Sequence, residues 1–297
     1  MYTEFRQSPA FQQLLRQSGS RVEKLDTNNV AYISRMLLIP FLSRIILLRV
    51  ENSGVLDKVK SLARQHRSIV VRVAPNALLG SQVAGEWETA LRKFGYQADQ
   101  APIAPTKTIL VNLQKGDSEL LAQMKSKTRY NIHLAQRRGV ETKVYEAKDL
   151  LNEQRVFKEF YSIYAQNCQR IGMSPPKCKD LQRIFSAFNE NLFIVHAYLK
   201  SGEAGAVAAY FFTSETTSYQ FNGTTLAGRH DFAADLVVWQ GFLEAKHRGC
   251  NWFDFDGIYD ERYPTDEDWK GFSHFKAGFG GEEVSLLGSY IKRWPFL

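Results

Sequence analysis

The chain has 297 residues, of which 44% are hydrophobic and 23% charged, and its formal net charge is +7. These proportions are those of a globular protein with room for one large or two ordinary domains. Three cysteines without a Cys-x-x-Cys pair and six scattered histidines argue against a disulfide framework and a structural zinc. No apolar run reaches the roughly 20 residues that span a bilayer. The positive charge suits a polyanionic partner such as tRNA, a nucleotide diphosphate or an anionic membrane surface.

The first 113 residues alternate between predicted helices and predicted strands. Helical periodicity covers residues 8–17, 55–65 and 83–94, and strands are expected at 30–33, 44–50, 69–73 and 108–113. This alternation favours an α/β domain. The first six residues are polar and lack the apolar core of a signal peptide, so we expect a cytoplasmic location.

Residues 117–138 are predicted to form a single helix, with Asp117 as its N-cap and Gly139 as its stop. Basic side chains recur every fourth residue on one face of this helix, with two more beside them: Lys125, Arg129, His133 and Arg137, then Lys127 and Arg138. Such a stripe can contact the phosphates of a nucleic acid. An ordinary solvated helix face has the same pattern, and this alternative stays open.

The remaining residues predict further helices and strands without a linker between them. Helices are expected at 150–171, 179–188 and 231–248, and strands at 140–145, 192–199, 206–213, 217–221, 252–256 and 284–291. Two helices that end in Arg-Gly, at 138–139 and 248–249, each lead into a strand, which indicates a faint internal repeat. We therefore expect two subdomains, residues 1–145 and 146–297. No heptad segment long enough for a helical-hairpin insertion is present.

The predicted strand at 252–256 is a candidate site, because alternation places Asp254 and Asp256 on one face. The alternative is that these acids cap a helix or pair with a lysine. A calcium loop is not expected, since the remaining oxygen ligands are missing. Gly-x-Ser-x-Gly, Gly-x-Gly-x-x-Gly and P-loop patterns are also absent, so we expect neither covalent catalysis nor a bound metal or cofactor.

Six short motifs occur in the order found in the Fem family of aminoacyltransferases, which attach amino acids from aminoacyl-tRNA to peptidoglycan precursor peptides. They are Met124-Lys125-x-Lys127-x-Arg129-x-Asn131-Ile132, Tyr219-x-Phe221-x-Gly223, Leu236-x-x-Trp239, Ala245-Lys246-x-x-Gly249, Phe253-Asp254-Phe255-x-Gly257-Ile258 and Phe275-Lys276-x-x-Phe279-Gly280-Gly281. The chain thus resembles this family over roughly residues 105–290. The resemblance implies two packed acetyltransferase-like (GNAT-like) subdomains.

The resemblance also implies roles for single residues. Lys276 matches a lysine that lies against donor and acceptor, where an ammonium would stabilise the oxyanion of aminoacyl transfer; a surface lysine is the alternative. Arg170 and Lys177 match basic residues for the acceptor's phosphates. Tyr219 matches an acceptor contact, although a strand tyrosine is more often core, and we add Asp254 to the acceptor-binding set. Lys125, Lys127, Arg129 and Arg137 would contact tRNA.

The function implied is transfer of an amino acid from aminoacyl-tRNA to a nucleotide-linked or lipid-linked peptidoglycan precursor, in cell-wall biogenesis and the maintenance of cell shape. Peripheral contact with the inner membrane face and a monomeric state go with this expectation. One alternative is an acetyl-CoA-dependent N-acetyltransferase of the same fold, although Gln220-Phe221-Asn222-Gly223-Thr224-Thr225 lacks the last small residue of a pyrophosphate loop. The other is a basic RNA-binding protein, although no RRM signature is present.

Overall fold

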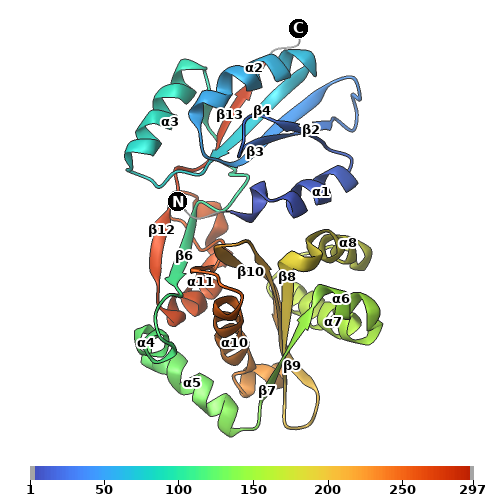
Figure 1. Ribbon diagram of the computed structural model, residues 1–297, viewed down its shortest axis with the longest axis vertical. Coiled ribbons are helices and arrows are strands. Elements are labelled where there is room, and N and C mark those ends of the chain that lie inside the picture. The colour runs from blue at the N-terminus through green and yellow to red at the C-terminus, as the bar shows by residue number, and fades with distance from the viewer. Residues whose placement is uncertain (1–3, 295–297) are drawn as a thin grey trace.

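The computed structural model describes residues 4–294 of the chain. It has two lobes stacked along the long axis, each built around one β-sheet with helices packed against it (Figure 1). The predicted α/β class is confirmed. Within residues 4–294 no helix is both long and apolar enough to cross a membrane.

The six-stranded sheet of the upper lobe takes most of its strands from the first hundred residues. In sheet order they are β1 (Arg21–Lys24), β2 (Val30–Arg35), β3 (Ser43–Val50), β4 (Ser68–Pro75), β13 (Tyr290–Arg293) and β5 (Gln97–Ala98). β3 and β4 are parallel, and the other neighbours are antiparallel. A 3₁₀ turn (Ser53–Val55), α2 (Leu56–Gln65) and α3 (Gln82–Lys93) bury Val59 and Trp87 against Ile45 and Leu47 of the sheet.

The lower lobe holds a seven-stranded sheet. In sheet order its strands are β12 (Glu282–Ser285), β6 (Lys107–Asn112), β11 (Trp252–Asp254), β10 (Thr216–Thr224), β9 (Ala204–Phe212), β8 (Leu192–Tyr198) and β7 (Glu141–Glu146). β10 and β11 are parallel, and the other pairs are antiparallel. β8 and β9 are buried along nearly their whole length, because helices cover both faces of the sheet.

The helices of the lower lobe divide between the two faces of its sheet. Phe193 and Val195 of β8 face α4 (Asp117–Gln123), α5 (Ser126–Arg137), α10 (Ala233–His247) and α11 (Lys270–Lys276). Ile194 faces α1 (Pro9–Gln17), α6 (Ala147–Asn152), α7 (Gln154–Arg170) and α8 (Cys178–Phe188). The other helical segments are short: α9 (Leu226–His230) and 3₁₀ turns at Phe5–Gln7, Asn189–Asn191, Pro264–Trp269 and Ala277–Phe279. The longest helix described, α7, has 17 residues, so no long helical hairpin projects from residues 4–294.

The two sheets divide the chain differently from the expected boundary after residue 145. The chain leaves the upper sheet after β5, enters the lower sheet at β6, and returns to the upper sheet with β13. Both helices of the faint repeat, α5 and α10, lead into strands of the same seven-stranded sheet. The repeat therefore lies within one lobe and does not relate the two lobes.

The single helix expected over residues 117–138 is wrong, because the chain breaks between α4 and α5. Met124 and Lys125 are extended, with ψ of 155° and 145°. The N–H of Lys125 donates to the Gly278 carbonyl at 2.8 Å, which no continuous helix would allow. Asp117 is not the N-cap: that position is Gly116, whose N–H donates to Glu119 at 2.8 Å. The break places the start of α5 beside the segment that follows α11.

Other boundaries also differ from the sequence prediction. The helix expected at 150–171 is interrupted at Glu153, which separates α6 from α7. The helix expected from residue 231 begins at Ala233, after Phe232 in the left-handed region with φ of 56°. The strand expected at 284–291 is two strands in different sheets, β12 and β13, separated by Gly288 with φ of 100°.

Candidate active site

Lys276 is the last residue of α11 and is buried, with 8% of its surface exposed. Its Nζ donates a hydrogen bond to the Gly257 carbonyl at 2.6 Å and lies 4.9 Å from the centre of the Phe272 ring. An ammonium has three N–H donors, and this is the one hydrogen bond that it makes within residues 4–294. Lys276 is therefore a pre-positioned buried cation and not the surface lysine of the alternative prediction.

The two glycines after Phe279 explain how α11 is held. Gly280 and Gly281 have φ of 80° and 89°, which glycine adopts without strain. A Cβ at Gly280 would lie 2.8 Å from the Gln123 carbonyl oxygen, and one at Gly281 would lie 2.5 Å from that of Leu110. The Phe-Gly-Gly motif thus lets the chain pass closely over α4 and β6 directly after Lys276.

Burial and nearby carboxylates act in opposite directions on Lys276. Burial lowers the pKa of its ammonium to about 8, and the charges of Asp256 and Asp254 oppose that change. The group is therefore mostly protonated at neutral pH and titrates just above it. Such a shift is typical of groups at functional sites.

The strand alternation predicted for Asp254 and Asp256 is wrong, because β11 ends at Asp254. Asp256 adopts a left-handed conformation with φ of 54°, and its N–H donates to the Asp254 carboxylate at 2.7 Å. The hydroxyl of Thr108 also donates to the Asp254 carboxylate. Asp254 therefore holds the turn that aims Asp256 away from the strand and toward the upper lobe.

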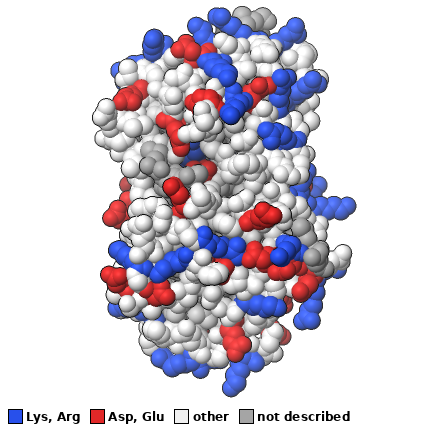
Figure 2. All heavy atoms as spheres, in the orientation of Figure 1, with Lys and Arg blue, Asp and Glu red and all other residues white. Residues whose placement is uncertain are grey.

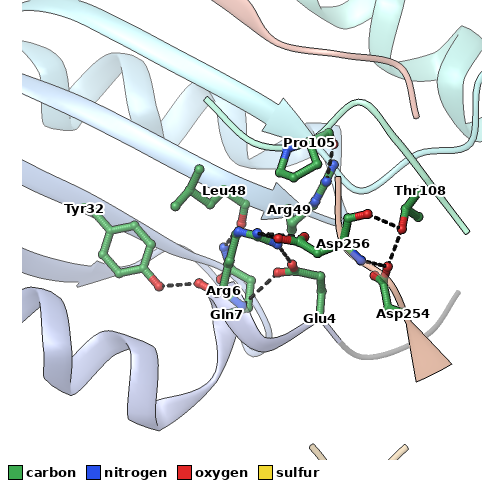
Figure 3. Close-up of polar contacts among 10 residues, drawn as sticks. All are labelled: Glu4, Arg6, Gln7, Tyr32, Leu48, Arg49, Pro105, Thr108, Asp254 and Asp256. Atoms are coloured by element: carbon green, nitrogen blue, oxygen red, sulfur yellow. Dashed lines mark hydrogen bonds and ion pairs between the residues drawn. The ribbon is translucent and has the colours of Figure 1, made fainter. Parts of the chain in front are cut away.

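At the waist between the lobes Asp256 meets the N-terminal segment (Figure 3). The Arg6 guanidinium donates to both oxygens of Asp256, at 2.9 and 3.1 Å, and also pairs with Glu4. The Tyr32 hydroxyl donates to the Arg6 carbonyl at 2.7 Å, which joins the segment to β2. Burial alone would raise the pKa of Asp256, but Arg6, Lys276 and Arg49 hold it below its ordinary value. Acidic and basic side chains lie on both sides of this waist (Figure 2).

Arg49 lies beside this cluster, at the end of β3. It is 5% exposed, has φ of 56°, and donates to the Pro105 carbonyl. Its Nε and the Oδ1 of Asn76 are both buried without a hydrogen-bond partner in the described chain. Both residues line a cavity of about 790 Å³ that α1, β3 and the β9–β10 turn enclose between the lobes. Buried unpartnered polar atoms at a cavity wall are suited to bind a polar ligand.

The segment that carries Lys276 matches the model of a known protein family. Residues 177–294, which include Asp254, Asp256 and Lys276, match the model of the FemAB family. The crystal structure of FemX superposes with a TM-score of 0.81 and 14% sequence identity, covering 98% of this chain and 92% of FemX. The family model covers less than half of the chain, and at 14% identity the likeness to FemX shows the fold. A comparison with curated protein sequences gives no match.

Two further structures resemble this protein in fold. The C-terminal domain of a putative lysylphosphatidylglycerol synthetase from Agrobacterium fabrum has a TM-score of 0.63 and 13% identity, covering 97% of this chain and 88% of that one. A tandem GNAT protein from the clavulanic acid biosynthesis pathway has a TM-score of 0.55 and 11% identity, covering 90% and 79%. At these identities the likeness shows the fold, and it confirms the predicted pair of GNAT-like subdomains.

Tyr219, Arg170 and Lys177, which were also predicted to bind the acceptor, do not join the Lys276 cluster. Tyr219 lies in the aromatic core, 5% exposed, with its ring centre 5.9 Å from that of Phe255. Arg170, at the end of α7, is exposed and donates to Asn167 at 2.9 Å. Lys177, before α8, is also exposed.

Of the four residues of the basic stripe that were predicted to contact tRNA, three lie at the surface. Lys125, Lys127 and Arg137 are exposed along α5. Arg129 is half-buried and donates to the carbonyls of Ala122 and Met124, so it caps the C-terminus of α4. The hydrogen bond from Lys125 to the Gly278 carbonyl places the start of the stripe beside the Lys276 segment.

Sequence analysis missed several residues of the cluster. Arg6 was missed because its partner Asp256 lies 250 positions away in the sequence, and Arg49 was missed because it belongs to no motif. Asp235 was also missed; it is buried in α10, accepts a hydrogen bond from Asn131 at 3.2 Å, and burial raises its pKa to about 6. Left-handed φ at two non-glycine residues, Arg49 and Asp256, is a signal that only coordinates reveal.

Proposed function

We propose that the protein transfers an amino acid from aminoacyl-tRNA to an amine of a peptidoglycan precursor peptide. The FemAB family match supports a peptidoglycan-related aminoacyltransferase. The observation that carries the proposal is the buried Lys276 ammonium, which donates to a backbone carbonyl and feels the charges of two carboxylates inside the matched segment. Because the donor is a cytoplasmic molecule, the reaction would take place in the cytoplasm.

Lys276 has the chemistry that aminoacyl transfer requires. The acceptor amine attacks the ester carbonyl, a C–N bond forms, negative charge collects on the carbonyl oxygen, and the ribose hydroxyl of tRNA leaves with a proton. A fixed cation stabilises that oxygen most effectively where water is excluded. Asp254 and Asp256 keep the Lys276 ammonium charged despite its burial. In this scheme Lys276 needs no metal and no cofactor as a partner.

The acceptor is proposed to enter the cavity between the lobes. Arg49 and Asn76 offer one unpartnered donor and one unpartnered acceptor at its wall, which suits a peptide or a phosphate. Arg170 and Lys177 remain proposed contacts for more distant phosphates of the acceptor. Asp254 and Tyr219 are better suited to support the site, the first through its turn and the second through its core packing.

The exposed stripe on α5 is proposed to bind the tRNA donor through its phosphates. Replacing Lys125, Lys127 and Arg137 together with alanine should weaken tRNA binding and flatten its salt dependence. The slope of log affinity against log salt should fall by roughly 0.7–0.9 for each lost phosphate contact. Filter binding across a salt series measures both quantities. The matched control replaces Arg92 and Arg183, exposed on α3 and α8, and should leave the slope unchanged.

The pKa of Lys276 predicts a pH profile for transfer. The ammonium form is present below pH 8, so activity should fall as pH rises through about 8. A Lys276→Arg variant, whose guanidinium stays charged throughout the pH range of the assay, should lose this descending limb even if its turnover is lower. The measurement is kcat/KM for the acceptor as a function of pH, for both proteins, with aminoacyl-tRNA saturating. A limb shared by both proteins belongs to another group and would contradict the assignment.

The decisive experiment incubates the protein with charged tRNA and nucleotide-linked or lipid-linked precursors, and identifies the products by mass spectrometry. A parallel reaction with acetyl-CoA tests the N-acetyltransferase alternative, and tRNA binding without any product would favour the RNA-binding alternative. The expected product is the precursor with one added aminoacyl group. An acetylated precursor in its place would overturn the proposal.

A further inference from the structure

The β2–β3 hairpin of the upper lobe displays apolar side chains to solvent. Leu37 is 96% exposed, Leu38 is 91% exposed and Phe41 is 66% exposed. A large aliphatic side chain on the surface is ordinary when isolated, but three in one five-residue stretch mark an interaction site. Figure 1 shows this loop at the outer edge of the upper lobe.

The loop is a closed turn that presents these side chains in a fixed arrangement. The N–H of Met36 donates to the Leu42 carbonyl at 3.0 Å, and the N–H of Leu42 donates to the Ile39 carbonyl at 2.9 Å. Leu42 is itself buried, 8% exposed, so it anchors the turn on the lobe. The exposed side chains are therefore held outward by the backbone and are not those of a disordered tail.

Arginines surround the base of this apolar tip. Arg35 ends β2 and Arg44 lies at the start of β3, opposite Ser34, so the two flank the tip. With Arg21 and Arg67 they line a cavity of about 890 Å³ beneath the tip, and no acidic residue lines it. Arg21 pairs with Glu23, whereas Arg35, Arg44 and Arg67 form no ion pair in the described chain. Basic side chains gather along the same edge in Figure 2.

We propose that this hairpin docks the protein onto an anionic lipid bilayer. The tip would enter the acyl region while the arginines meet phosphate headgroups at its base, as in other peripheral anchors that combine apolar and basic residues. A protein partner would need an apolar pocket for the tip and acidic side chains around it for the arginines. An anionic bilayer offers an acyl region and phosphate headgroups in this arrangement over its whole surface. The docking stands on these residues alone, and only its purpose, reaching a lipid-linked acceptor, rests on the proposed function.

Vesicle sedimentation tests the docking. The full chain should bind vesicles of phosphatidylcholine mixed with phosphatidylglycerol at least tenfold more tightly than vesicles of phosphatidylcholine alone. Leu37→Asp/Leu38→Asp should weaken binding to the anionic vesicles by about tenfold or more, since each leucine contributes a buried side chain. Arg35→Gln/Arg44→Gln should remove the preference for anionic lipid. Phe41→Trp should show a blue-shifted fluorescence maximum when anionic vesicles are added.

Leu226→Asp is the matched control, because Leu226 is 77% exposed but lies at the start of α9 in the other lobe. It should bind vesicles like the unaltered protein. Thermal unfolding of every variant should be unchanged, because the replaced side chains are exposed. If Leu226→Asp weakens vesicle binding as much as Leu37→Asp/Leu38→Asp does, the proposal is overturned. It is also overturned if the unaltered chain does not bind vesicles.

Two further outcomes would overturn it in favour of another partner. If only the arginine variant loses binding, the contact is electrostatic and the hairpin does not insert. If the unaltered chain doubles its mass in sedimentation without lipid, and Leu37→Asp/Leu38→Asp restores the monomer, the tip covers a second copy. Transfer to a soluble nucleotide-linked precursor should be the same for all hairpin variants, so failure of docking and failure of the proposed function are distinguishable.

Discussion

Replacing Lys276 with alanine should lower turnover by about 10²–10³-fold, the usual loss when one oxyanion donor is removed. The reason is that, in the proposed mechanism, the ammonium held by the Gly257 carbonyl stabilises the charge that develops on the ester oxygen. Lys276→Met is the sharper variant, because it keeps an aliphatic stem of similar length and removes the ammonium. Steady-state kinetics with tRNA and acceptor both varied measures the effect.

The stability of the Lys276 variants must be measured with their kinetics. Because the side chain is buried, its loss leaves the Gly257 carbonyl without its donor, at a cost of about 1–3 kcal/mol. A variant that unfolds at the same temperature as the unaltered protein but turns over slowly supports the catalytic role. Full turnover with a raised KM for tRNA alone would assign Lys276 to donor binding and contradict the oxyanion role.

Replacing Arg6 with methionine should lower the free energy of unfolding by about 2–3 kcal/mol. Removing one partner of a fully buried ion pair costs about 3–5 kcal/mol, and the smaller value is expected because the Asp256 side chain is 21% exposed. Denaturant unfolding measures the change. Arg21→Met is the matched control: its pair with Glu23 is exposed, and such pairs contribute about 0–1 kcal/mol.

The same ion pair predicts the response of stability to acid. The folded pKa of Asp256 lies below its ordinary value, so its contribution is present above pH 4 and is lost as pH falls through the folded pKa. Arg6→Met should therefore lose less stability on acidification than the unaltered protein does. A double-mutant cycle with Asp256→Asn isolates the pair. A coupling energy near zero would show that this ion pair does not stabilise the fold.

Much of this fold follows from local sequence patterns, because periodicity identifies helices and strands wherever one face is buried. α2, α3 and β8 lie within a residue of their predicted ends. The break at Met124 was not predictable, since it depends on a hydrogen bond between Lys125 and Gly278, far along the chain. Likewise β12 and β13 were predicted as one strand, because the sequence around Gly288 does not indicate that the segments on its two sides belong to different sheets.

The candidate site was predictable only in part, for the same reason. The Phe-Lys-x-x-Phe-Gly-Gly motif identified Lys276 as a candidate, but its burial depends on Gly257 and Asp256, which are brought to it by a turn. Alternation placed Asp254 and Asp256 together, whereas the left-handed φ of Asp256 separates their directions. Arg6 and Arg49 carry no motif, and only the packing of the lobes gives them neighbours of opposite charge.

The position of β13 has a consequence for how the protein is made. This strand lies between β4 and β5 in the upper sheet, although it comes from residues 290–293. As the chain leaves the ribosome, the first hundred residues emerge without the strand that completes their sheet, while the lower lobe has all of its strands by residue 285. Domains of most chains fold in the order of synthesis. Here the lower lobe is complete first, and the upper sheet lacks the strand between β4 and β5 until residues 290–293 have emerged.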